Sequence, residues 1–456
     1  MADTHHIVDW DPEDATAWRT GNHAIARGNL IWSTATAHVA FSIWYLWSVM
    51  VLFMPQAVYG FTPSDKLLVG ATAALVGAVV RIPYTMATTR FGARNWATFS
   101  SLILLIPTSG AMVLLANPGV SLWPYLVCAG LTGLGGGNYA AALANAEVLY
   151  PQRLKGLALG LTGGIANLGV ASIQVVGLVV LAAAGHREPY WVCAIYLVLL
   201  AVVGAGAALF MDNFSQPIRV ADLRCALAVP DTWGILLLYV TVSGSFLGFA
   251  FAFGQVIHLN LLARGQSHAQ ASLHAAEVAF VGPLLGSVAR VIGGWLSDRL
   301  GGGRVTLAAL AGMIAAGGFL VGVSSRQDVI GGPGGPKTIL TMAGYIAGFI
   351  ALFIFCGVGK GSVSKLIPTV FAARCCTLDV SEEQRRHQQS AMSGSVLGLA
   401  GALGALGATV TNLVLRQSYL SAHTETPAFV SFLVCYVGAA LLTWARYVRP
   451  PAAQGL

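Results

Sequence analysis

Leu75-Val-Gly-Ala-Val-Val-Arg81 is an apolar segment that ends in arginine, and it recurs 209 residues later as Leu284-Leu-Gly-Ser-Val-Ala-Arg290. Each copy is followed by a basic turn, at residues 90–92 and 299–301. Two glycine-rich segments, at residues 133–137 and 159–169, recur in the same order at 357–361 and 397–407. Ordered internal repeats indicate a chain that is built from two related halves.

The composition around these repeats is typical of a membrane protein. Of 456 residues, 56% are apolar, 9% are charged and 54 are glycine. Soluble domains carry about 25% charged residues, so the composition excludes an ordinary soluble enzyme. Apolar stretches long enough to cross a bilayer as helices recur throughout, and the short alternating segments of a β-barrel are not seen. We predict an all-α integral membrane protein with twelve transmembrane helices, at residues 32–54, 67–87, 96–116, 122–148, 157–184, 190–211, 233–256, 274–296, 305–324, 338–366, 390–414 and 427–445.

Turn residues divide the chain into two pseudo-symmetric six-helix halves. The polar lead has no positive start before a short apolar core, so we do not expect a cleavable signal. The predicted segments are a cytoplasmic N-terminal segment (1–30), an N-terminal half (31–211), a cytoplasmic linker (212–231), a C-terminal half (232–445) and a cytoplasmic tail (446–456).

Basic residues are unevenly distributed between the two faces of this arrangement. If both termini lie on one side, that side holds fifteen of the 25 arginines and lysines, and four fall within spans. The cytoplasmic side carries the excess of such residues, so both termini are predicted to be cytoplasmic. The same bias accounts for the net charge of +7 without nucleic-acid binding. The opposite side holds Lys66, Arg187, Arg264, Arg326, Lys337 and Arg416.

Arg81 and Arg290 are the strongest functional candidates. An arginine at the centre of a bilayer is unfavourable by about 2.5–3.5 kcal/mol on insertion scales, and such residues usually face a cavity. A structural arginine that reaches the membrane surface or pairs with a carboxylate is the alternative. No midspan carboxylate is found, since Glu147 and Glu277 lie near helix ends. We therefore predict an anionic ligand, because the planar guanidinium pairs well with planar oxyanions.

Other polar residues within the spans have two possible roles. Asn138 and Asn167 are midspan amides that either bind neighbouring helices or line the site. Lys360 and Lys365 lie five residues apart and must point to different faces of a helix; we leave open whether Lys360 reaches the cavity. The seven cysteines have no metal or redox spacing, so neither a metal nor a cofactor is predicted.

Two glycine-rich signatures identify a family resemblance. Leu134-Gly-Gly-Gly-Asn138-Tyr, followed by Gly160-Leu-Thr-Gly-Gly-Ile-Ala-Asn167, resembles the first signature of the nitrate/nitrite porter family of the major facilitator superfamily. Gly357-Val-Gly-Lys-Gly-Ser362 resembles the second, and residues 293–304 resemble the superfamily's loop between helices 8 and 9. The resemblance covers nearly the whole chain.

The resemblance implies roles for named residues. Arg81 and Arg290 are expected to clamp the anion. Three positions depart from the family pattern: Ser243 and Ser364 replace aromatic residues that close the site, and Lys360 replaces a small or amide residue. These three are possible substrate or coupling residues. The other expected substrate-binding residues are Asn167, Tyr239, Tyr139 and Phe41.

The function predicted from all of this is transport of nitrate and nitrite by alternating access, in a monomer in the bacterial cytoplasmic membrane that serves nitrate assimilation. Exchange of the two anions is the favoured coupling. Proton symport is the alternative and needs a titrating group, for which His38, Glu147, Glu277 and Lys360 are candidates. A membrane sensor that binds nitrate without moving it is a third reading, although no signalling domain is recognised. An enzyme is not expected, because no nucleophile–base pair is found.

Overall fold

The computed structural model describes residues 6–7, 10–185, 188–214, 227–333, 335, 338–375 and 382–449. Parts of the predicted N-terminal segment, linker and tail lie outside these residues, as do Arg187 and Lys337. The described chain is helical apart from a short parallel pair, β1 (His6–Ile7) and β2 (Asn213–Phe214).

The predicted membrane fold is confirmed. Eleven helices among the described residues are long and apolar enough to cross a membrane, and a bent pair of helical segments brings the number to twelve. The bent pair is the first predicted span, in which the helix ending at Trp44 and the one beginning at Leu46 meet at 42°. Sequence analysis predicted an unbroken span at 32–54, and the bend at Tyr45 occurs without a proline or glycine.

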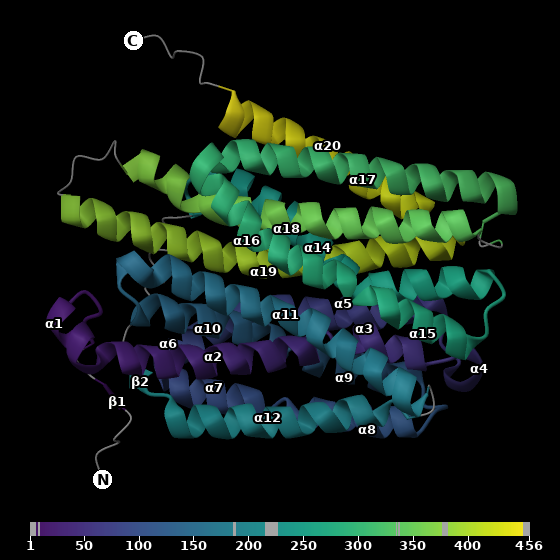
Figure 1. Cartoon of the computed structure of the whole chain (residues 1–456), viewed down its shortest axis with the longest axis horizontal. Coiled ribbons are helices and arrows are strands. Elements are labelled where there is room, and N and C mark those ends of the chain that lie inside the picture. The colour runs from purple at the N-terminus through teal and green to yellow at the C-terminus, as the bar shows by residue number, and fades with distance from the viewer. Residues whose placement is uncertain are drawn as a thin grey trace. The chain divides into compact units, whose positions relative to one another are not determined.

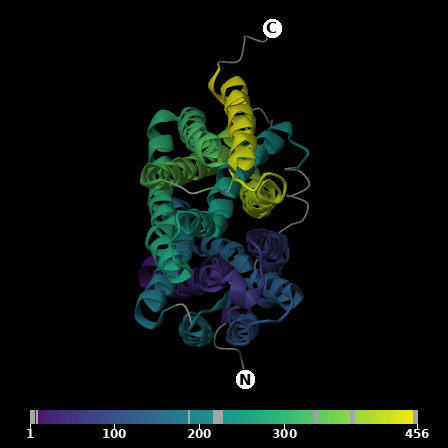
Figure 2. The same ribbon diagram turned by 90° about the vertical axis from the view of Figure 1, so that its right-hand side faces the viewer.

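Contacts divide the chain into two compact units. The first consists of Met1–Ile218, Ala250–His258 and Ser267–Pro283. Its central helix α2 packs against α10, α11 and α12. Figure 1 shows α2 running alongside the neighbouring helices, and Figure 2 views the helices of this unit nearly end-on. The elements are α1 (Ala15–Ala17), η1 (Trp18–Asn22), α2 (His23–Trp44), α3 (Leu46–Met50), η2 (Val51–Phe53), α4 (Gln56–Tyr59), α5 (Pro63–Val79), α6 (Arg81–Phe91), α7 (Ala93–Leu102), α8 (Leu105–Ala116), α9 (Leu122–Thr132), α10 (Gly135–Leu149), α11 (Gln152–Ala184), α12 (Tyr190–Phe210) and α15 (His268–Ala279).

The second unit consists of Arg219–Phe249, Leu259–Gln266 and Leu284–Leu456. Within it α17 packs against α18 and α20, and α18 packs against α19. Its elements are α14 (Pro230–Ala263, partly in the first unit), α16 (Val281–Leu300), α17 (Gly302–Gly331), α18 (Ile339–Cys375), α19 (Glu382–Ala422), α20 (Thr426–Thr443) and η3 (Trp444–Val448).

The two units do not coincide with the two sequence halves. Segments of α14 and α15 belong to the first unit because they bind its helices directly. Gln174 donates a hydrogen bond of 3.1 Å to the Ala250 carbonyl, and Gln255 donates one of 2.8 Å to the Pro63 carbonyl. These bonds satisfy polar groups that would otherwise be buried without a partner.

Local chemistry explains where several helices begin and break. Thr62 and Asp65 form a reciprocal capping box that starts α5. A second box starts α15. The break between α5 and α6 precedes Pro83, which lacks the N–H that would bind the Val79 carbonyl. Arg81 therefore lies at the first residue of α6 rather than within an unbroken helix.

Glycines allow several helix pairs to approach closely. A Cβ added at Gly135 of α10 would lie 2.1 Å from the Ala40 carbonyl oxygen of α2, and one at Gly357 of α18 would lie 2.1 Å from the Gly286 carbonyl oxygen of α16. Small residues at helix contacts are typical of membrane bundles. Gly160 and Gly164 differ, because nothing lies within 4 Å of an added Cβ there.

Large apolar side chains cover the outer faces of α8 and α12. Ile106 is 63% exposed and Val198 is 64% exposed. Contiguous exposed apolar surface marks an interaction site, and in a protein with helices of this length the partner is the lipid hydrocarbon. The chain is therefore a multi-pass membrane protein.

Candidate functional site

Arg81 lies in an aromatic box within the first unit. Its side chain is 3% exposed, and its guanidinium carbon is 5.1 Å from the ring centroids of both Trp44 and Tyr139. Phe41 lies 4.9 Å from Trp44 and 5.4 Å from Tyr139 between ring centroids. The structure thus places three predicted site residues, Arg81, Phe41 and Tyr139, in one cluster. Each cation–π contact stabilises the cation by about 0.5–2 kcal/mol.

The position of Trp44 depends on its packing against α5. Its indole Nε1 donates a hydrogen bond of 2.8 Å to the Ala73 carbonyl. The ring crosses α5 at Gly77, where an added Cβ would lie 2.3 Å from Nε1. Because Gly77 has no side chain, the Trp44 ring can lie directly against α5. The Trp44 ring in turn contacts one side of the Arg81 guanidinium.

Asn167 lies on α11, which packs against α2. Its side chain is 1% exposed, and its amide nitrogen donates a hydrogen bond of 2.7 Å to the Gly163 carbonyl one turn earlier. Part of its hydrogen-bonding capacity is therefore used within its own helix. Its predicted role in anion binding stays a prediction.

In the second unit, Tyr239 and Ser243 lie one turn apart on α14. Their side chains are 3% and 1% exposed. Both lie against Gly404 of α19, where an added Cβ would be 3.1 Å from the Tyr239 ring and 2.9 Å from the Ser243 hydroxyl oxygen. Ser243 therefore presents a small hydroxyl in close contact with Gly404, at the position where the family resemblance implies an aromatic residue.

Lys360 and Arg290 lie on neighbouring helices of the same unit. Lys360 is 4% exposed, and its ammonium is 5.0 Å from the centroid of the Phe246 ring. The next residue, Gly361, approaches the Arg290 carbonyl so closely that an added Cβ would lie 2.1 Å away. Arg290 itself is half-buried on α16. The Lys360 side chain is therefore inside the unit rather than at its surface.

Ser364 and Lys365 lie further along α18. The Ser364 hydroxyl donates a hydrogen bond of 2.8 Å to the Lys360 carbonyl. Lys365 is exposed, and its ammonium is 3.0 Å from a carboxylate oxygen of Asp298. Asp298 lies in the last turns of α16, so most of the stretch expected to be a loop at residues 293–304 is helical. An exposed ion pair of this kind contributes little to stability, and it leaves Lys365 outside the buried cluster around Lys360.

Sequence reasoning did not identify Trp44 or Tyr45. Trp44 follows Phe41 by three residues, which places both on one face of α2, and that spacing was the available signal. Tyr45 stacks on Phe251 at 4.1 Å between ring centroids. Nothing local predicts that contact, because the two residues are about two hundred positions apart in the sequence.

Two buried histidines were also missed. His258 of α14 is 2% exposed, and its ring centroid lies 4.7 Å from that of His268 on α15. The Ser272 hydroxyl lies 3.4 Å from Nδ1 of each ring, and Lys66 is buried in the same unit. None of these basic groups is among the four residues that the sequence suggested for proton coupling. Within the described ranges no group of histidine, cysteine or carboxylate side chains is arranged to hold a metal.

Comparison with known proteins decides the family. The family model described as "Major Facilitator Superfamily" matches residues 33–411. The chain belongs to this superfamily. A nitrate/nitrite transporter, NarU of Salmonella typhimurium (strain LT2), is 30% identical over 97% of this chain and 96% of its own length. A probable nitrate/nitrite antiporter, NarK2 of Thermus thermophilus, is 28% identical over 98% of this chain and 97% of its own length. The crystal structure of the nucleoside transporter NupG has a TM-score of 0.63 at 10% identity and covers 91% of this chain and 98% of its own.

These relatives confirm the resemblance to the nitrate/nitrite porter family. The likeness to the nucleoside transporter shows the fold alone, because sequence identity at that level carries no information on the substrate. A member of this superfamily is a transporter and not an enzyme.

Proposed function

We propose that this transporter carries nitrate and nitrite across the membrane by alternating access, and that it exchanges one anion for the other. The observation that carries the proposal is the Arg81 guanidinium, 3% exposed and flanked at 5.1 Å by the rings of Trp44 and Tyr139. Aromatic faces contact the guanidinium plane, and a guanidinium presents its N–H donors along the edge of that plane. That edge matches two oxygens of a planar oxyanion.

The proposed roles follow the chemistry of each side chain. Arg81 and Arg290 supply the positive charge and paired hydrogen bonds. Asn167 and Tyr239 supply neutral hydrogen bonds. The rings of Phe41 and Tyr139 exclude water, which strengthens the charge–anion attraction at short range. The names of the relatives support nitrate and nitrite over other planar oxyanions such as bicarbonate.

Exchange is proposed for an electrostatic reason. Taking a charge out of water is unfavourable by several kcal/mol unless it is paired. An empty carrier must move its fixed arginine charges through a poorly hydrated state, whereas a loaded carrier moves them with a compensating anion. The loaded form should therefore reorient faster. The name of the Thermus relative, an antiporter, supports this coupling.

The setting proposed for this activity is the cytoplasmic membrane of a bacterium, where the protein acts as a monomer in nitrate assimilation. The basic residues that precede α2 and follow α20 support cytoplasmic termini. Reaction of an added N-terminal cysteine with a membrane-impermeant maleimide, in intact cells and in opened vesicles, tests this orientation.

Internal nitrite is expected to stimulate uptake of labelled nitrate into proteoliposomes by about tenfold or more, because the loaded carrier avoids a barrier difference of at least about 1.4 kcal/mol. An imposed pH gradient without internal anion should have little effect. The measurement is initial nitrate uptake with nitrite, chloride or buffer alone inside. Chloride is the control for charge without oxyanion geometry.

Two results would replace this proposal. Accumulation of nitrate driven by the pH gradient alone would establish proton symport, for which His38, Glu147, Glu277 and Lys360 are the candidate groups. Saturable nitrate binding without any flux would indicate the sensor.

Lys360 and Lys365 form a matched pair for testing charge near the site. Lys360→Met is expected to weaken nitrate binding by about tenfold, because it removes a buried positive charge worth at least about 1.4 kcal/mol to an anion nearby. Lys365→Met removes an exposed charge that is paired with Asp298 and should change binding by less than about twofold. Calorimetric titration with nitrate at fixed ionic strength measures both. Equal effects of the two variants would show that Lys360 acts only through the general field of the protein.

A further inference from the structure

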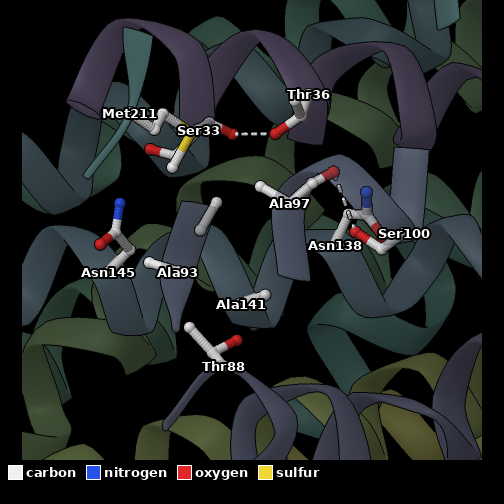
Figure 3. Close-up of a pocket in the computed structure, with 11 residues that line it drawn as sticks. Ser33, Thr36, Thr88, Ala93, Ala97, Ser100, Asn138, Ala141, Asn145 and Met211 are labelled. Atoms are coloured by element: carbon white, nitrogen blue, oxygen red, sulfur yellow. Dashed lines mark hydrogen bonds between the residues drawn. The ribbon is translucent and has the colours of Figure 1, made fainter. Parts of the chain in front are cut away.

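A small cavity of about 10 Å³ lies in the first unit and is bordered by α2, α6, α7 and α10. This volume is enough for about one water molecule. Figure 3 shows the side chains that line it. Two amides of α10, Asn138 and Asn145, face it. Four hydroxyls come from the other helices: Ser33, Thr36, Thr88 and Ser100.

The cavity is separate from the aromatic box around Arg81. Asn138 precedes Tyr139, and successive side chains of a helix point about 100° apart. Tyr139 faces Arg81, while Asn138 faces the cavity together with Asn145, seven residues on and thus on the same face of α10. The cavity therefore lies on a different side of α10 from the proposed anion site.

The amides that face the cavity lack hydrogen-bond partners among the described residues. Asn138 is 3% exposed, and neither its Nδ2 nor its Oδ1 has a partner. Asn145 is 5% exposed, and its Nδ2 has none. A buried polar group without a partner is unfavourable by about 1–3 kcal/mol. Three such atoms around one cavity therefore indicate an occupant that forms hydrogen bonds.

The four hydroxyls indicate which hydrogen bonds an occupant of the cavity can form. Thr36 and Thr88 each donate a hydrogen bond of 2.9 Å to a backbone carbonyl of their own helix. Ser33 and Ser100 do the same at 3.3 Å. Because a hydroxyl has one hydrogen and two lone pairs, all four remain acceptors toward the cavity. A water-sized occupant can donate to hydroxyl oxygens or to Asn138 Oδ1 and can accept from an Nδ2 group.

An anion does not fit this description. An anion such as nitrate cannot donate, and none of the side chains that line the cavity is charged, so it would be buried without compensation. Water donates and accepts, and buried waters typically make about three hydrogen bonds to groups of this kind.

We infer that this cavity is a water-binding site that joins α10 to α2, α6 and α7. A water molecule bound there lies between an amide of α10 and hydroxyls of the facing helices. Bridges through water can exchange partners when helices shift, whereas close-packed side chains resist displacement. Because α6 carries Arg81 and α10 carries Tyr139, the bound water supports the helices that form the aromatic box and lets them move during transport. The water site itself does not rest on the proposed substrate.

Met211 provides a direct readout of this water. Its side chain lines the cavity and is 0% exposed. X-ray pulses convert bound water to hydroxyl radicals, which oxidise an adjacent methionine thioether. In the full-length protein in nanodiscs, Met211 should be oxidised at least about threefold faster than a buried methionine without water beside it. Met313 of α17 is the control, because it is also 0% exposed and does not line the cavity.

Variants of Asn138 complete the test. Asn138→Leu replaces the amide with an apolar side chain of similar size and should lower the oxidation rate of Met211 to that of Met313. Asn138→Ser keeps a polar group and should retain most of the rate. Equal rates for Met211 and Met313 in the unmodified protein would overturn the inference, whether or not either variant folds.

Transport assays distinguish the binding of water in the cavity from the proposed role of that water in helix movement. Folded Asn138→Leu should bind nitrate with unchanged affinity and turn over several-fold more slowly, since only helix movement is impaired. Normal turnover in a variant that has lost the water would refute the role in movement. Loss of nitrate affinity instead would place Asn138 in the substrate site. Failure of the unmodified protein to transport nitrate at all would count against the proposed function and leave the footprinting result intact.

Discussion

Arg81→Lys is expected to reduce nitrate transport by at least about 100-fold although the positive charge is kept. The guanidinium donates a planar pair of hydrogen bonds, and each charge-assisted bond is worth about 1.5–3 kcal/mol. Lysine presents a single compact ammonium that cannot pair with two oxygens in one plane. It also loses the flat contact with the rings of Trp44 and Tyr139, which hold the guanidinium at 5.1 Å from each. Initial uptake of labelled nitrate into proteoliposomes measures the effect.

Arg90→Lys is the matched control for this experiment. Arg90 lies on the same helix, α6, and it is exposed with its guanidinium 5.8 Å from the Phe91 ring. Its replacement should change transport by less than about twofold, because an exposed charge contributes little. Transport by Arg81→Lys that is comparable with Arg90→Lys would refute the role of Arg81 in binding the anion. Arg290→Lys is expected to behave like Arg81→Lys.

The sequence was sufficient to predict the fold because membrane helices leave strong local signals. Length, hydropathy and the repeat that ends in Arg81 and Arg290 predicted twelve helices in two related halves. The bend at Tyr45 escaped prediction, since neither proline nor glycine marks it. The residue at the bend makes a long-range contact, because Tyr45 is buried against Phe251, about two hundred residues further on in the chain.

The site was predicted only in part, for a related reason. Arg81 could be found because a charge within an apolar helix is rare. Phe41 and Tyr139 came from the family resemblance. Trp44 went unrecognised, since its position depends on the missing side chain at Gly77 and on a hydrogen bond to Ala73, both on another helix. Such contacts are set by three-dimensional packing and have no signature in the sequence around Trp44.

Contacts between polar groups were likewise missed where they depend on packing between helices rather than on a local sequence pattern. His258 and His268 lie on different helices, and no spacing rule links them. Their ring contact at 4.7 Å depends on how α14 and α15 pack. Asn138 was visible in the sequence as a midspan amide, but only the structure separates it from the anion site, because it shows that Asn138 faces a cavity and Tyr139 faces Arg81.

Gly135→Ala is expected to destabilise the protein by about 1–3 kcal/mol, the usual effect of an extra methyl group in a packed interior. The added Cβ would lie 2.1 Å from the Ala40 carbonyl oxygen, which is backbone and cannot rotate away. Helix α10 must therefore move away from α2. Tyr139 lies one turn further along α10, and Phe41 and Trp44 lie on α2, so the movement also opens the aromatic box around Arg81. Nitrate affinity should fall together with stability.

Gly160→Ala is the control that distinguishes the steric clash expected at Gly135 from the change in helix propensity that accompanies any replacement of glycine by alanine. Nothing lies within 4 Å of an added Cβ at Gly160, so alanine meets no obstacle there and raises helix propensity by up to about 1 kcal/mol. Thermal unfolding in detergent, with and without nitrate, should show a lower midpoint for Gly135→Ala and an unchanged or higher one for Gly160→Ala. Stabilisation by nitrate should be smaller in Gly135→Ala than in the unmodified protein, because at a fixed nitrate concentration the stabilisation of the folded state rises with the logarithm of affinity. Equal midpoints for the two variants would mean that the contact between α10 and α2 does not determine the geometry of the Arg81 box.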